Sequence, residues 1–570
     1  MSTHPTQRNT RLLGSLGALL ALLAATLAAL AAVPGAEPAD AQRRAQVRPN
    51  IIVIQTDDQA WREFFATYVD AGGIGRRVMP RLMDEVREGG ILFNRYHSTY
   101  PTCCPSRTTL LSGRYAHSHG VISNGAPRGG WPGFQRRAVY NHNLAVWLQR
   151  AGYRTYHYGK FLNQYGQVGA PEDEVPPGWT DWQSDATDLS TRQFYGYLLN
   201  VNGQIQGPFG NPEYGQGENQ DPPGCGPAVA LGNICNYQTD TMTRRTLDRI
   251  AGSVPGGPFY LQVDYIAPHG DHRQPIGPEP APRHYDSAIN TPLPKPQGLF
   301  NEGNISDKPS FIRDQANYLD PTTIRRIKRE YQKSLESLRA VDDGIGLIVD
   351  ALRASGELRN TYIFVLSDNG FFFGEHRLER SKFLPYEPAV HLPLFVRGPG
   401  IRFNTVSGEL VGNIDLAPTI VELARARATR GFDGRSLVRF WRDPALRTRR
   451  PILLESFAKA TDIDGDGDID FRRDPGRRDR PQAGASITAP IENYLGIRLG
   501  PYKYVEYETG DRELYDLSKD PKELNNRYGD PRYRRVQARL RYLLQQLENC
   551  HGSECRVVAN ELPPVGFSRR

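Results

Sequence analysis

The sequence predicts an α/β fold built on a mainly parallel central sheet flanked by helices. Three observations support this prediction: the chain contains four apolar, β-rich runs, helical patterns lie between them, and a polar cluster follows each run within a few residues. Continuous Val, Ile, Phe and Tyr runs are typical of strands buried on both faces of a parallel sheet. The 570 residues exceed what one small core requires, so we expect a large domain with a smaller companion.

The four runs end in side chains that can carry out chemistry. In chain order they read "NIIVIQTDD" from residue 50, "RTYHYGK" from 154, "PFYLQVDYIAPHG" from 258 and "TYIFVLSDNG" from 361. In open α/β sheets, ligands bind at the carboxyl ends of the strands. We therefore expect the side chains that follow these strands to converge on one site.

The clearest helical pattern lies at residues 324–348. Its apolar residues are spaced three and four apart, which places them on one stripe of a helix. They are Ile324, Ile327, Tyr331, Leu335, Leu338, Val341, Ile345 and Ile348. Asp342 and Asp343 fall within this helix, and we expect them on a solvated or salt-bridged face.

The pattern of predicted elements changes after "ELARARATRG". The short strands "NYLGIRLG" and "YKYVEYE" and a basic helix around "YRRVQARLRYLLQQLEN" predict a smaller α+β domain. We place a catalytic domain at residues 48–425 and the smaller C-terminal domain at residues 426–560.

Residues 1–41 have the pattern of a secretory signal peptide. Arg8 and Arg11 precede an Ala/Leu-rich run at 12–33, and Ala39-Asp40-Ala41 fits a small-x-small cleavage site. An uncleaved membrane anchor is the alternative, which the Pro/Ala-rich tail before "AQRRAQ" disfavours. We expect a secreted or extracytoplasmic protein with no membrane association after signal removal, because no later segment could span a bilayer.

Export places the six cysteines in an oxidising compartment, which favours disulfides. Two pairs are close in sequence and are predicted to form local bridges: Cys225 with Cys235, and Cys550 with Cys555. The remaining two, Cys103 and Cys104, are neighbours, and a bridge between neighbours is strained. At least one of them therefore needs another explanation.

The net charge of +7 is modest for this length. It suits an anionic ligand only weakly, and the chain has no continuous basic run and no nucleic-acid reading motif. We therefore expect no nucleic-acid partner.

Two of the polar clusters have the chemistry of a metal site. Asp57, Asp58, Asp368 and Asn369 offer only oxygen ligands and three formal negative charges, which favours calcium, or less well magnesium, over zinc. Each cluster alone could be a helix cap or a turn. Because both follow strands and their like charges need a counter-ion, we favour the metal site.

The segment "PTCCPSRTTLLSGRY" predicts a helix start at or just after Cys103. Pro105 suits the first turn of a helix. Backbone N–H groups, the helix dipole and Arg107 would stabilise an anion there. Two interpretations follow from the residues alone: a thiol nucleophile or a buried structural cysteine.

The stretch "CCPSRTTLLSGRY" resembles the C-x-P-S-R signature of type I sulfatases. The resemblance extends over most of the chain, through "IIVIQTDDQ", "GKFLNQYG", "APHG", "SDNGFFFGEH", "SKFLPYE", "LPLFVRGPGI", "NIDLAPTIVELA" and "ETGDRELYDLSKDPKELNN". "GKFLNQYG" with "APHG" is most similar to N-acetylglucosamine-6-sulfatases and heparan 6-O-endosulfatases. The resemblance implies an alkaline-phosphatase-like large domain and a secreted sulfatase of sulfated sugars.

The resemblance also implies the site. A formylglycine-generating enzyme would oxidise Cys103 to formylglycine, and Cys104 would occupy the variable position of the signature. A hydroxyl of the hydrated aldehyde would attack sulfur to give a covalent sulfo-enzyme, from which the second hydroxyl expels sulfate. The implied calcium ligands are Asp57, Asp58, Asp368, Asn369 and the modified Cys103; Arg107 would hold the formylglycine, Lys160 and Lys382 would contact the sulfate, and His269 would protonate the leaving alcohol.

One asparagine and three histidines are further positions of interest. Many sulfatases have a histidine two or three residues after the first lysine, where this chain has Leu162 and Asn163. Asn163 could hydrogen-bond the diol but cannot act as a base near neutral pH. His376 could line the substrate pocket or lie on a surface loop, and His117 and His119 are expected to be turn and packing residues.

A second metal signal lies at residues 462–473. "DIDGDGDID" places Asp462, Asp464, Asp466, Asp468 and Asp470 in the order of an EF-hand-like loop. The twelfth position is Arg473 rather than Glu, and no flanking helices are apparent, so it is not a full EF-hand. A second calcium loop and a disordered acidic insertion both fit this pattern.

The favoured function is hydrolysis of sulfate monoesters of the N-acetylglucosamine-6-sulfate type. A phosphomonoester or phosphodiester hydrolase of the same superfamily is the alternative, which the C-P-S-R motif and the paired lysines disfavour. A non-catalytic glycan-binding protein would be expected to have lost some of the site residues, and none is missing.

Overall fold

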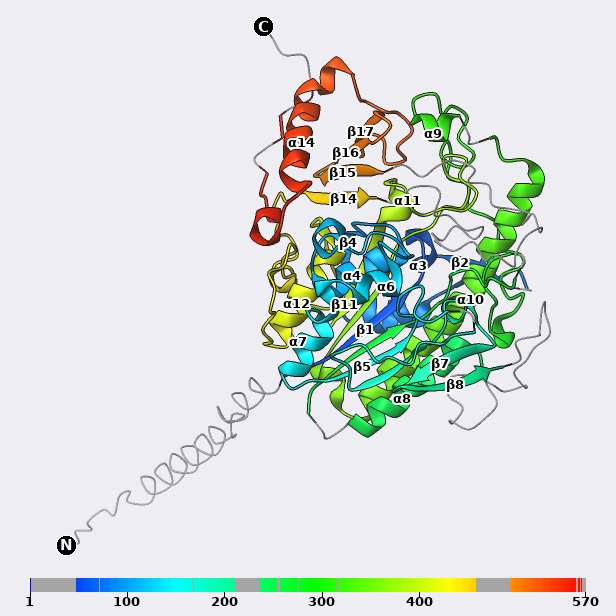
Figure 1. The fold of residues 1–570 in the computed structure, drawn as a ribbon, viewed down its shortest axis with the longest axis vertical. Helices are drawn as coiled ribbons and strands as arrows, with labels where there is room; N and C mark the ends of the chain where they lie inside the picture. Colours follow the sequence, from blue (N-terminus) through cyan, green and yellow to red (C-terminus); the bar gives the residue numbers. More distant parts are fainter. Residues whose placement is uncertain are drawn as a thin grey trace. The chain divides into compact units, whose positions relative to one another are not determined.

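The computed structural model describes residues 1, 48–70, 72–167, 169–210, 236–253, 257–274, 276–314, 317–457, 493–559, 562–563 and 565. Contacts group residues 49–570 into one compact unit (Figure 1). The predicted signal peptide after Met1, the Cys225–Cys235 pair and the acidic loop at 462–473 lie outside the described residues. Within the described residues, no helix is long and apolar enough to cross a membrane.

Among the described residues, a mixed sheet of eleven strands forms the centre of this unit (Figure 1). Its strands are β1 Asn50–Thr56, β4 Ile91–His97, β5 Arg154–Gly159, β6 Asp181–Asp185, β7 Tyr197–Val201, β8 Gln204–Phe209, β9 Phe259–Asp264, β10 Thr361–Ser367, β11 His391–Arg397, β12 Thr405–Ser407 and β13 Val411–Gly412. The order is β12-β4-β11-β10-β1-β9-β5-β6-β7-β8, with β13 beside β4. Strands β10, β1, β9, β5 and β6 run parallel to one another. The four predicted strands are therefore confirmed as neighbours in the parallel part of the sheet.

Helices cover both faces of the sheet because its central strands are apolar on both sides. In β1, Ile52 and Ile54 join one apolar cluster, and Ile51 and Val53 join another. Helices α8 Gln238–Ser253 and α10 Pro321–Ala354 pack on the first face. The second face is covered by α4 Cys103–Ser112, α7 Leu144–Arg150, α12 Leu416–Leu423 and α13 Val438–Arg442.

The predicted helix at 324–348 is confirmed as the central part of α10. Asp320 caps it by accepting hydrogen bonds from the backbone N–H groups of Thr322 and Thr323. Asp343 forms ion pairs with Arg283 and His284, as predicted for a salt-bridged face.

For Asp342, the prediction of a solvated or salt-bridged face is wrong. Its side chain is 3% exposed and accepts hydrogen bonds from the backbone N–H groups of Arg81 and Leu82. Those two N–H groups lie at the start of η1 Leu82–Arg87, which packs beside α10. Asp342 therefore accepts hydrogen bonds from backbone donors that have no partner within η1.

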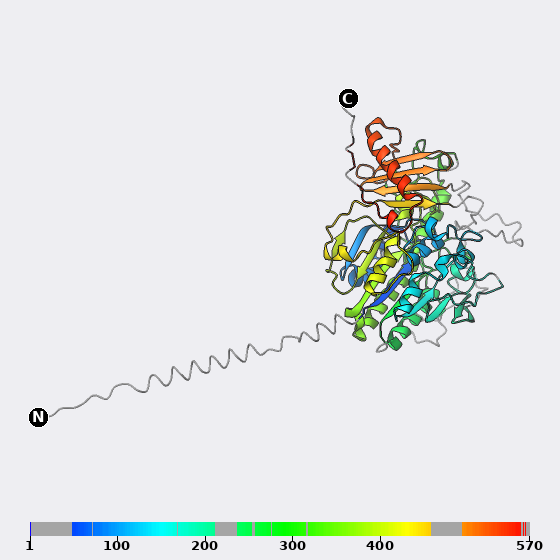
Figure 2. The ribbon, with the colours of Figure 1, turned by 60° about the vertical axis from the view of Figure 1, so that its left-hand side comes forward.

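A second sheet of four antiparallel strands lies near the C-terminus. Its strands are β14 Ile452–Ser456, β15 Tyr494–Leu499, β16 Tyr502–Tyr507 and β17 Arg512–Asp516, and α14 Arg534–Leu547 packs on one face (Figure 2). The predicted strands and basic helix of this region are confirmed, as is the disulfide between Cys550 and Cys555.

The short elements are α3 Trp61–Phe64, β2 Thr67–Val69, β3 Gly75–Arg77, α5 Ala116–His119, α6 Gly130–Gln135, η2 Ala138–Tyr140, η3 Ser190–Arg192, η4 Pro282–His284, α9 Ser310–Arg313, η5 Glu357–Asn360, α11 Glu387–Val390, η6 Asn413–Asp415, η8 Pro531–Tyr533 and η9 Gly552–Cys555.

The other face of the small sheet supports the segment that carries Lys382. The buried Lys503 of β16 donates a hydrogen bond to the carbonyl of Pro385 at 2.7 Å and pairs with Glu387 at 2.8 Å. The Tyr386 hydroxyl donates to Glu513 of β17 at 2.8 Å. Residues 385–387 are thereby fixed against the C-terminal sheet.

His117 joins α5 to the C-terminal region. Its Nδ1 lies 2.7 Å from a Glu455 carboxylate oxygen in β14, and its Nε2 lies 2.8 Å from the carbonyl oxygen of Cys550. Because both partners can only accept, both ring nitrogens carry hydrogens, as in an imidazolium ion. His119 is buried and bonded to Thr109 and the backbone of Val121, so both histidines are packing residues, as predicted.

We predict that the His117–Glu455 pair makes stability depend on pH. Burial alone would lower the pKa of His117, but the Glu455 carboxylate and the hydrogen bonds outweigh it and raise the pKa from 6.5 to about 9. The stabilisation, roughly 3 kcal/mol, is fully present below the unfolded pKa of 6.5 and is lost as the pH rises through the folded pKa of about 9. The melting temperatures of the wild type and His117→Gln should therefore converge across this range.

Thermal melts at several pH values would measure this convergence. His142→Gln is the control, because burial lowers the pKa of His142. The difference in melting temperature between the wild type and this variant should stay constant as the pH rises from 6.5 to about 9. A difference in melting temperature between the wild type and His117→Gln that does not change with pH would contradict the prediction.

Candidate active site

The carboxyl ends of four neighbouring strands carry the predicted site residues. Asp57 and Asp58 follow β1, Lys160 follows β5, and Asp368 with Asn369 follows β10. His269 lies five residues beyond β9, and all six side chains are buried. The structure brings these residues together, along with Cys103, Arg107 and Lys382, in the contacts described below.

Cys103 is the first residue of α4 and is fully buried. Its Sγ lies 3.1 Å from Lys382 Nζ, 3.4 Å from Asp57 Oδ1 and 3.9 Å from Lys160 Nζ. Burial, with the Asp57 carboxylate adding to it, raises the pKa of the thiol well above its ordinary value despite the two lysines. Residue 103 is therefore a neutral thiol among charged groups, which disfavours the thiolate interpretation.

Arg107 lies one helical turn after Cys103 and joins three of the strand ends. Its Nε donates to Asp368 at 3.0 Å, and its Nη2 donates to Asp57 at 3.2 Å. Its Nη1 donates to the backbone carbonyl of Lys160 at 3.0 Å. The fork of the guanidinium thus holds the ends of β1, β5 and β10 in one arrangement.

The acidic residues form an oxygen-lined cluster that fits a hard cation. One ligand atom each of Asp57, Asp58 and Cys103 lie within 4.8 Å of one another. Asn369 Nδ2 donates to Asp58 at 2.6 Å, whereas its buried Oδ1 has no hydrogen-bond partner among the described residues. Burial raises the pKa of Asp368 to about 7, with Asp57 adding to the rise and Arg107 opposing it. An unpaired buried oxygen beside crowded carboxylates is what a divalent cation would satisfy.

Two lysines and a histidine surround this cluster. Lys160 Nζ lies 2.5 Å from Asp57 and Lys382 Nζ lies 2.9 Å from Asp58, so each lysine is paired with a different aspartate. His269 Nε2 lies 3.8 Å from Asp58, and its Nδ1 donates to the carbonyl of Gly270 at 2.8 Å. Two ammonium groups next to residue 103 would attract the oxygens of an anionic ester.

Asn163 and His376, the two predicted contacts of the diol or substrate, do not contact Cys103 in the hydrogen bonds described here. Asn163 contacts Cys104: its Oδ1 accepts a hydrogen bond from the Cys104 thiol at 3.3 Å, and its backbone N–H donates back to that sulfur at 3.2 Å. His376 is fully buried, with Nδ1 2.6 Å from Glu302 and its ring 4.4 Å from that of Tyr386. The surface-loop alternative for His376 is therefore wrong.

Sequence reasoning missed a buried polar group behind Arg107. Asp264 of β9 accepts hydrogen bonds from His157 at 2.9 Å and Gln262 at 2.7 Å, and it lies 3.6 Å from the Arg107 guanidinium. The available signal was the alternation in "FYLQVD", where polar residues recur every second position of a strand that is otherwise apolar. Such alternation marks one polar stripe inside a buried sheet.

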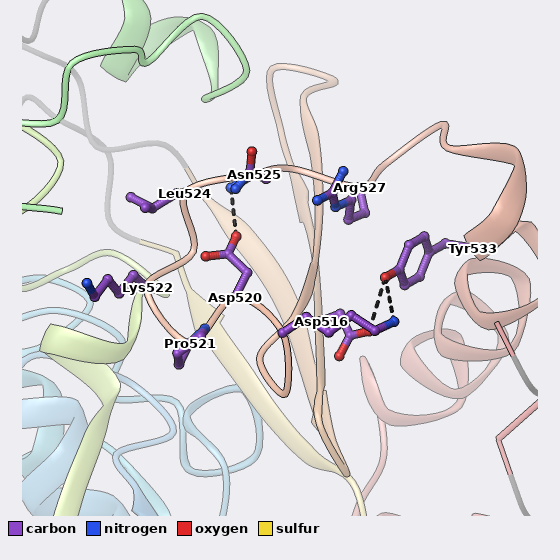
Figure 3. A pocket seen from close by; sticks show the side chains of 9 residues that line it. Asp516, Asp520, Pro521, Lys522, Leu524, Asn525, Arg527 and Tyr533 are labelled. Atoms are coloured by element: carbon purple, nitrogen blue, oxygen red, sulfur yellow. Dashed lines mark hydrogen bonds and ion pairs between the residues drawn. The ribbon is translucent and has the colours of Figure 1, made fainter. Parts of the chain in front are cut away.

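A separate cavity of about 420 Å³ lies beside β17 and η8 (Figure 3). Its lining residues are Asp516, Lys519, Asp520, Pro521, Lys522, Leu524, Asn525, Arg527 and Tyr533. None of the predicted site residues lines it. The chemistry at Cys103 is therefore not located in this cavity.

Comparison with known families matches most of the chain. Residues 49–426 match the family described as "Sulfatase", and residues 487–550 match the one described as "N-sulphoglucosamine sulphohydrolase, C-terminal". The first match contains every residue of the site described above.

Named relatives and solved structures agree with this match. An arylsulfatase of Volvox carteri is 31% identical over 92% of this chain and 78% of its own length. The N-acetylglucosamine-6-sulfatase of Homo sapiens is 28% identical over 92% of this chain and 88% of its own length. A solved structure of a protein in complex with its substrate D-glucosamine-2-N,6-O-disulfate has a TM-score of 0.65 at 22% identity, covering 87% of this chain and 97% of that one, and it supports the fold.

We predict that a divalent cation stabilises the folded protein through Asn369. Calcium at about a hundredfold excess over its dissociation constant should add about 2.7 kcal/mol to stability and raise the melting temperature above that in a chelator. Asn369→Ala should remove much of this rise, because it deletes the unpaired Oδ1. Asn290→Ala, at an exposed position, is the matched control.

Melting curves in chelator, calcium and magnesium would test this. A smaller rise that persists in Asn369→Ala is expected from the remaining ligands Asp57, Asp58 and Asp368. Equal calcium-induced rises in the wild type and Asn369→Ala would remove Asn369 from the cation site.

Proposed function

This chain belongs to the sulfatase family, and we propose that it removes 6-O-sulfate from N-acetylglucosamine or glucosamine units of sulfated glycans. The family makes it a sulfuric ester hydrolase. The similarity to an N-acetylglucosamine-6-sulfatase over 92% of the chain supports the sugar. The observation that carries the chemistry is Cys103 at the start of α4, with two lysines beside it and an acidic, oxygen-lined cluster below.

Cys103 is the nucleophile position in this proposal, after its conversion to formylglycine by a separate maturation enzyme. The buried neutral thiol would be a poor nucleophile as it stands, since the thiolate is the reactive form. Formylglycine supplies a hydrated aldehyde, whose hydroxyls can attack sulfur and then release sulfate through a covalent sulfo-enzyme. Signal-directed export of the chain is part of the same proposal.

Asp57, Asp58, Asp368 and Asn369, together with residue 103, would hold a calcium ion. Calcium is preferred over magnesium because the donors are protein carboxylates and an amide oxygen, whereas magnesium usually keeps several waters. The bound cation would neutralise negative charge on the sulfate oxygens. Arg107 keeps two of the four residues in place through its bonds to Asp57 and Asp368.

The basic side chains take three positions around the ester. Lys382 and Lys160, 3.1 and 3.9 Å from the sulfur of residue 103, would bind non-bridging sulfate oxygens. His269 would donate a proton to the departing sugar oxygen from Nε2, because its Nδ1 hydrogen is used by the Gly270 carbonyl. Nε2 lies 3.8 Å from Asp58 Oδ2, so this nitrogen lies beside the acidic cluster.

The charge of this site favours sulfate over phosphate. A sulfate monoester carries one negative charge at neutral pH, whereas a phosphate monoester is largely dianionic. One cation and two lysines, both already paired with aspartates, suit the smaller charge. The phosphoester hydrolase alternative would need a stronger positive field.

We predict that active protein carries formylglycine at position 103. The tryptic peptide that contains this residue should be lighter than its cysteine form by about the mass of one water molecule and should react as an aldehyde. Cys103→Ala should abolish turnover. Cys104→Ser is the matched control and should stay active, because a hydroxyl can replace the thiol in the bond to Asn163. Active enzyme with only cysteine at 103 would refute this mechanism.

We predict that His269→Ala affects substrates according to their leaving group. With N-acetylglucosamine-6-sulfate, kcat should fall roughly a hundredfold or more, because a sugar alkoxide leaves poorly without a proton. With an activated aryl sulfate, the loss should be small. His142→Ala, outside the site, should leave both rates unchanged.

Steady-state kinetics on the two sulfates measures this difference. Equal losses on both substrates would remove His269 from the acid role. Faster release of phosphate from glucosamine-6-phosphate than of sulfate from glucosamine-6-sulfate by the wild type would favour the phosphoester alternative.

A further inference from the structure

One segment that follows α12 is rich in arginine and strongly positive. Residues 425–450 contain nine arginines, two aspartates and no lysine, a formal charge of +7. The whole 570-residue chain also has a net charge of +7, so the rest of the chain is neutral in sum. This segment alone therefore carries as much net positive charge as the whole chain.

Most of these arginines face solvent. Seven are exposed: Arg425, Arg427, Arg430, Arg439, Arg442, Arg447 and Arg449. Arg450 is different, since it is buried and paired with Asp415 at 2.8 Å. Among the described residues, no carboxylate forms an ion pair with Arg427, Arg430 or Arg442, so their charge is available to a ligand. We call the seven exposed residues the arginine surface.

The arginine surface belongs to the layer of helices that also carries the nucleophile position. The backbone N–H groups of Asp433 and Gly434 donate to the carbonyl of Gly113, which ends α4. Helix α4 is ten residues long, so this junction lies about 15 Å from Cys103 at its other end. The segment that carries the arginine surface is thus joined to the end of α4 opposite Cys103, and a ligand that contacts both would have to be an extended polymer.

The composition of this surface indicates which polyanion fits it. Arginine presents a planar fork that bonds two oxygens of a sulfate or phosphate group at once, and this segment uses arginine alone. The segment has no exposed large hydrophobic side chain: Phe440 and Trp441 are buried, and Phe432 is half-buried. Insertion into a membrane requires exposed apolar groups and base stacking requires exposed aromatic groups, so an inserted membrane contact or a single-stranded nucleic acid fits less well.

We propose that the arginine surface is a second binding site for sulfated polysaccharide, which holds a polymeric substrate while one sulfated sugar is processed at Cys103. The choice of a sulfated polymer, rather than another polyanion, rests on the function proposed above. Exposed arginines add binding energy through many weak, salt-sensitive contacts, so the site would act mainly on KM for polymers.

The test uses the full mature chain and heparin as the probe. The variant Arg427→Gln/Arg430→Gln/Arg442→Gln removes three charges that no carboxylate pairs with. At low salt, its affinity for heparin should fall roughly tenfold to thirtyfold, as expected for three exposed ion pairs. The control, Arg77→Gln/Arg313→Gln/Arg325→Gln, removes three exposed charges from other elements and should change affinity by roughly twofold or less.

Kinetics on two substrates separates this proposal from the proposed function. The first variant should keep the wild-type kcat/KM on N-acetylglucosamine-6-sulfate and show a raised KM on a 6-O-sulfated polymer. If the wild type hydrolyses neither substrate but loses heparin affinity in the first variant only, the arginine surface stands and the proposed function falls. Unchanged heparin affinity in the first variant, equal losses in both variants, or wild-type binding of hyaluronan or double-stranded DNA as tight as that of heparin would overturn the proposal.

Discussion

The structure depends on keeping three aspartates, Asp57, Asp58 and Asp368, buried in one place. Three carboxylates taken out of water repel one another and lose their hydration, so each needs a compensating charge or hydrogen bond. The protein supplies Arg107, Lys160 and Lys382, each in contact with at least one of the three. The unpaired Oδ1 of Asn369 leaves an additional position that a cation would fill. The same arrangement of charge that stabilises the site is the one that would bind an anionic ester.

The groups that compensate the charge of the three aspartates come from distant parts of the chain. Arg107 comes from α4, the lysines come from loops after β5 and β10, and Asp264 supports Arg107 from β9. The C-terminal sheet is part of the same system, because Lys503 and Glu513 fix residues 385–387, just after Lys382. The small sheet therefore holds the end of the loop that carries Lys382.

The sequence predicted the architecture where the signal was local and repetitive. Continuous apolar runs identified β1, β5, β9 and β10, and the three-and-four spacing identified α10, because burial on two faces or on one stripe imposes those periods. It failed for Asp342, since an acidic residue in a helix is usually solvated. Only the neighbouring start of η1, more than two hundred residues earlier in the chain, makes burial of that carboxylate favourable.

The sequence by itself determined which residues form the site: parallel strands place their carboxyl ends at one edge, so polar residues after each buried run must meet there. The motif around Cys103 added the proposed nucleophile position and the helix start. Only the tertiary structure decided the pairings, such as Asn163 with Cys104, Arg107 with Asp57 and Asp368, and Lys503 with Glu387. The spacing of apolar residues follows from the local geometry of a helix or a strand, so it can be read from one segment. A pairing between residues far apart in sequence depends on how the layers of the fold pack together. No single segment contains that information.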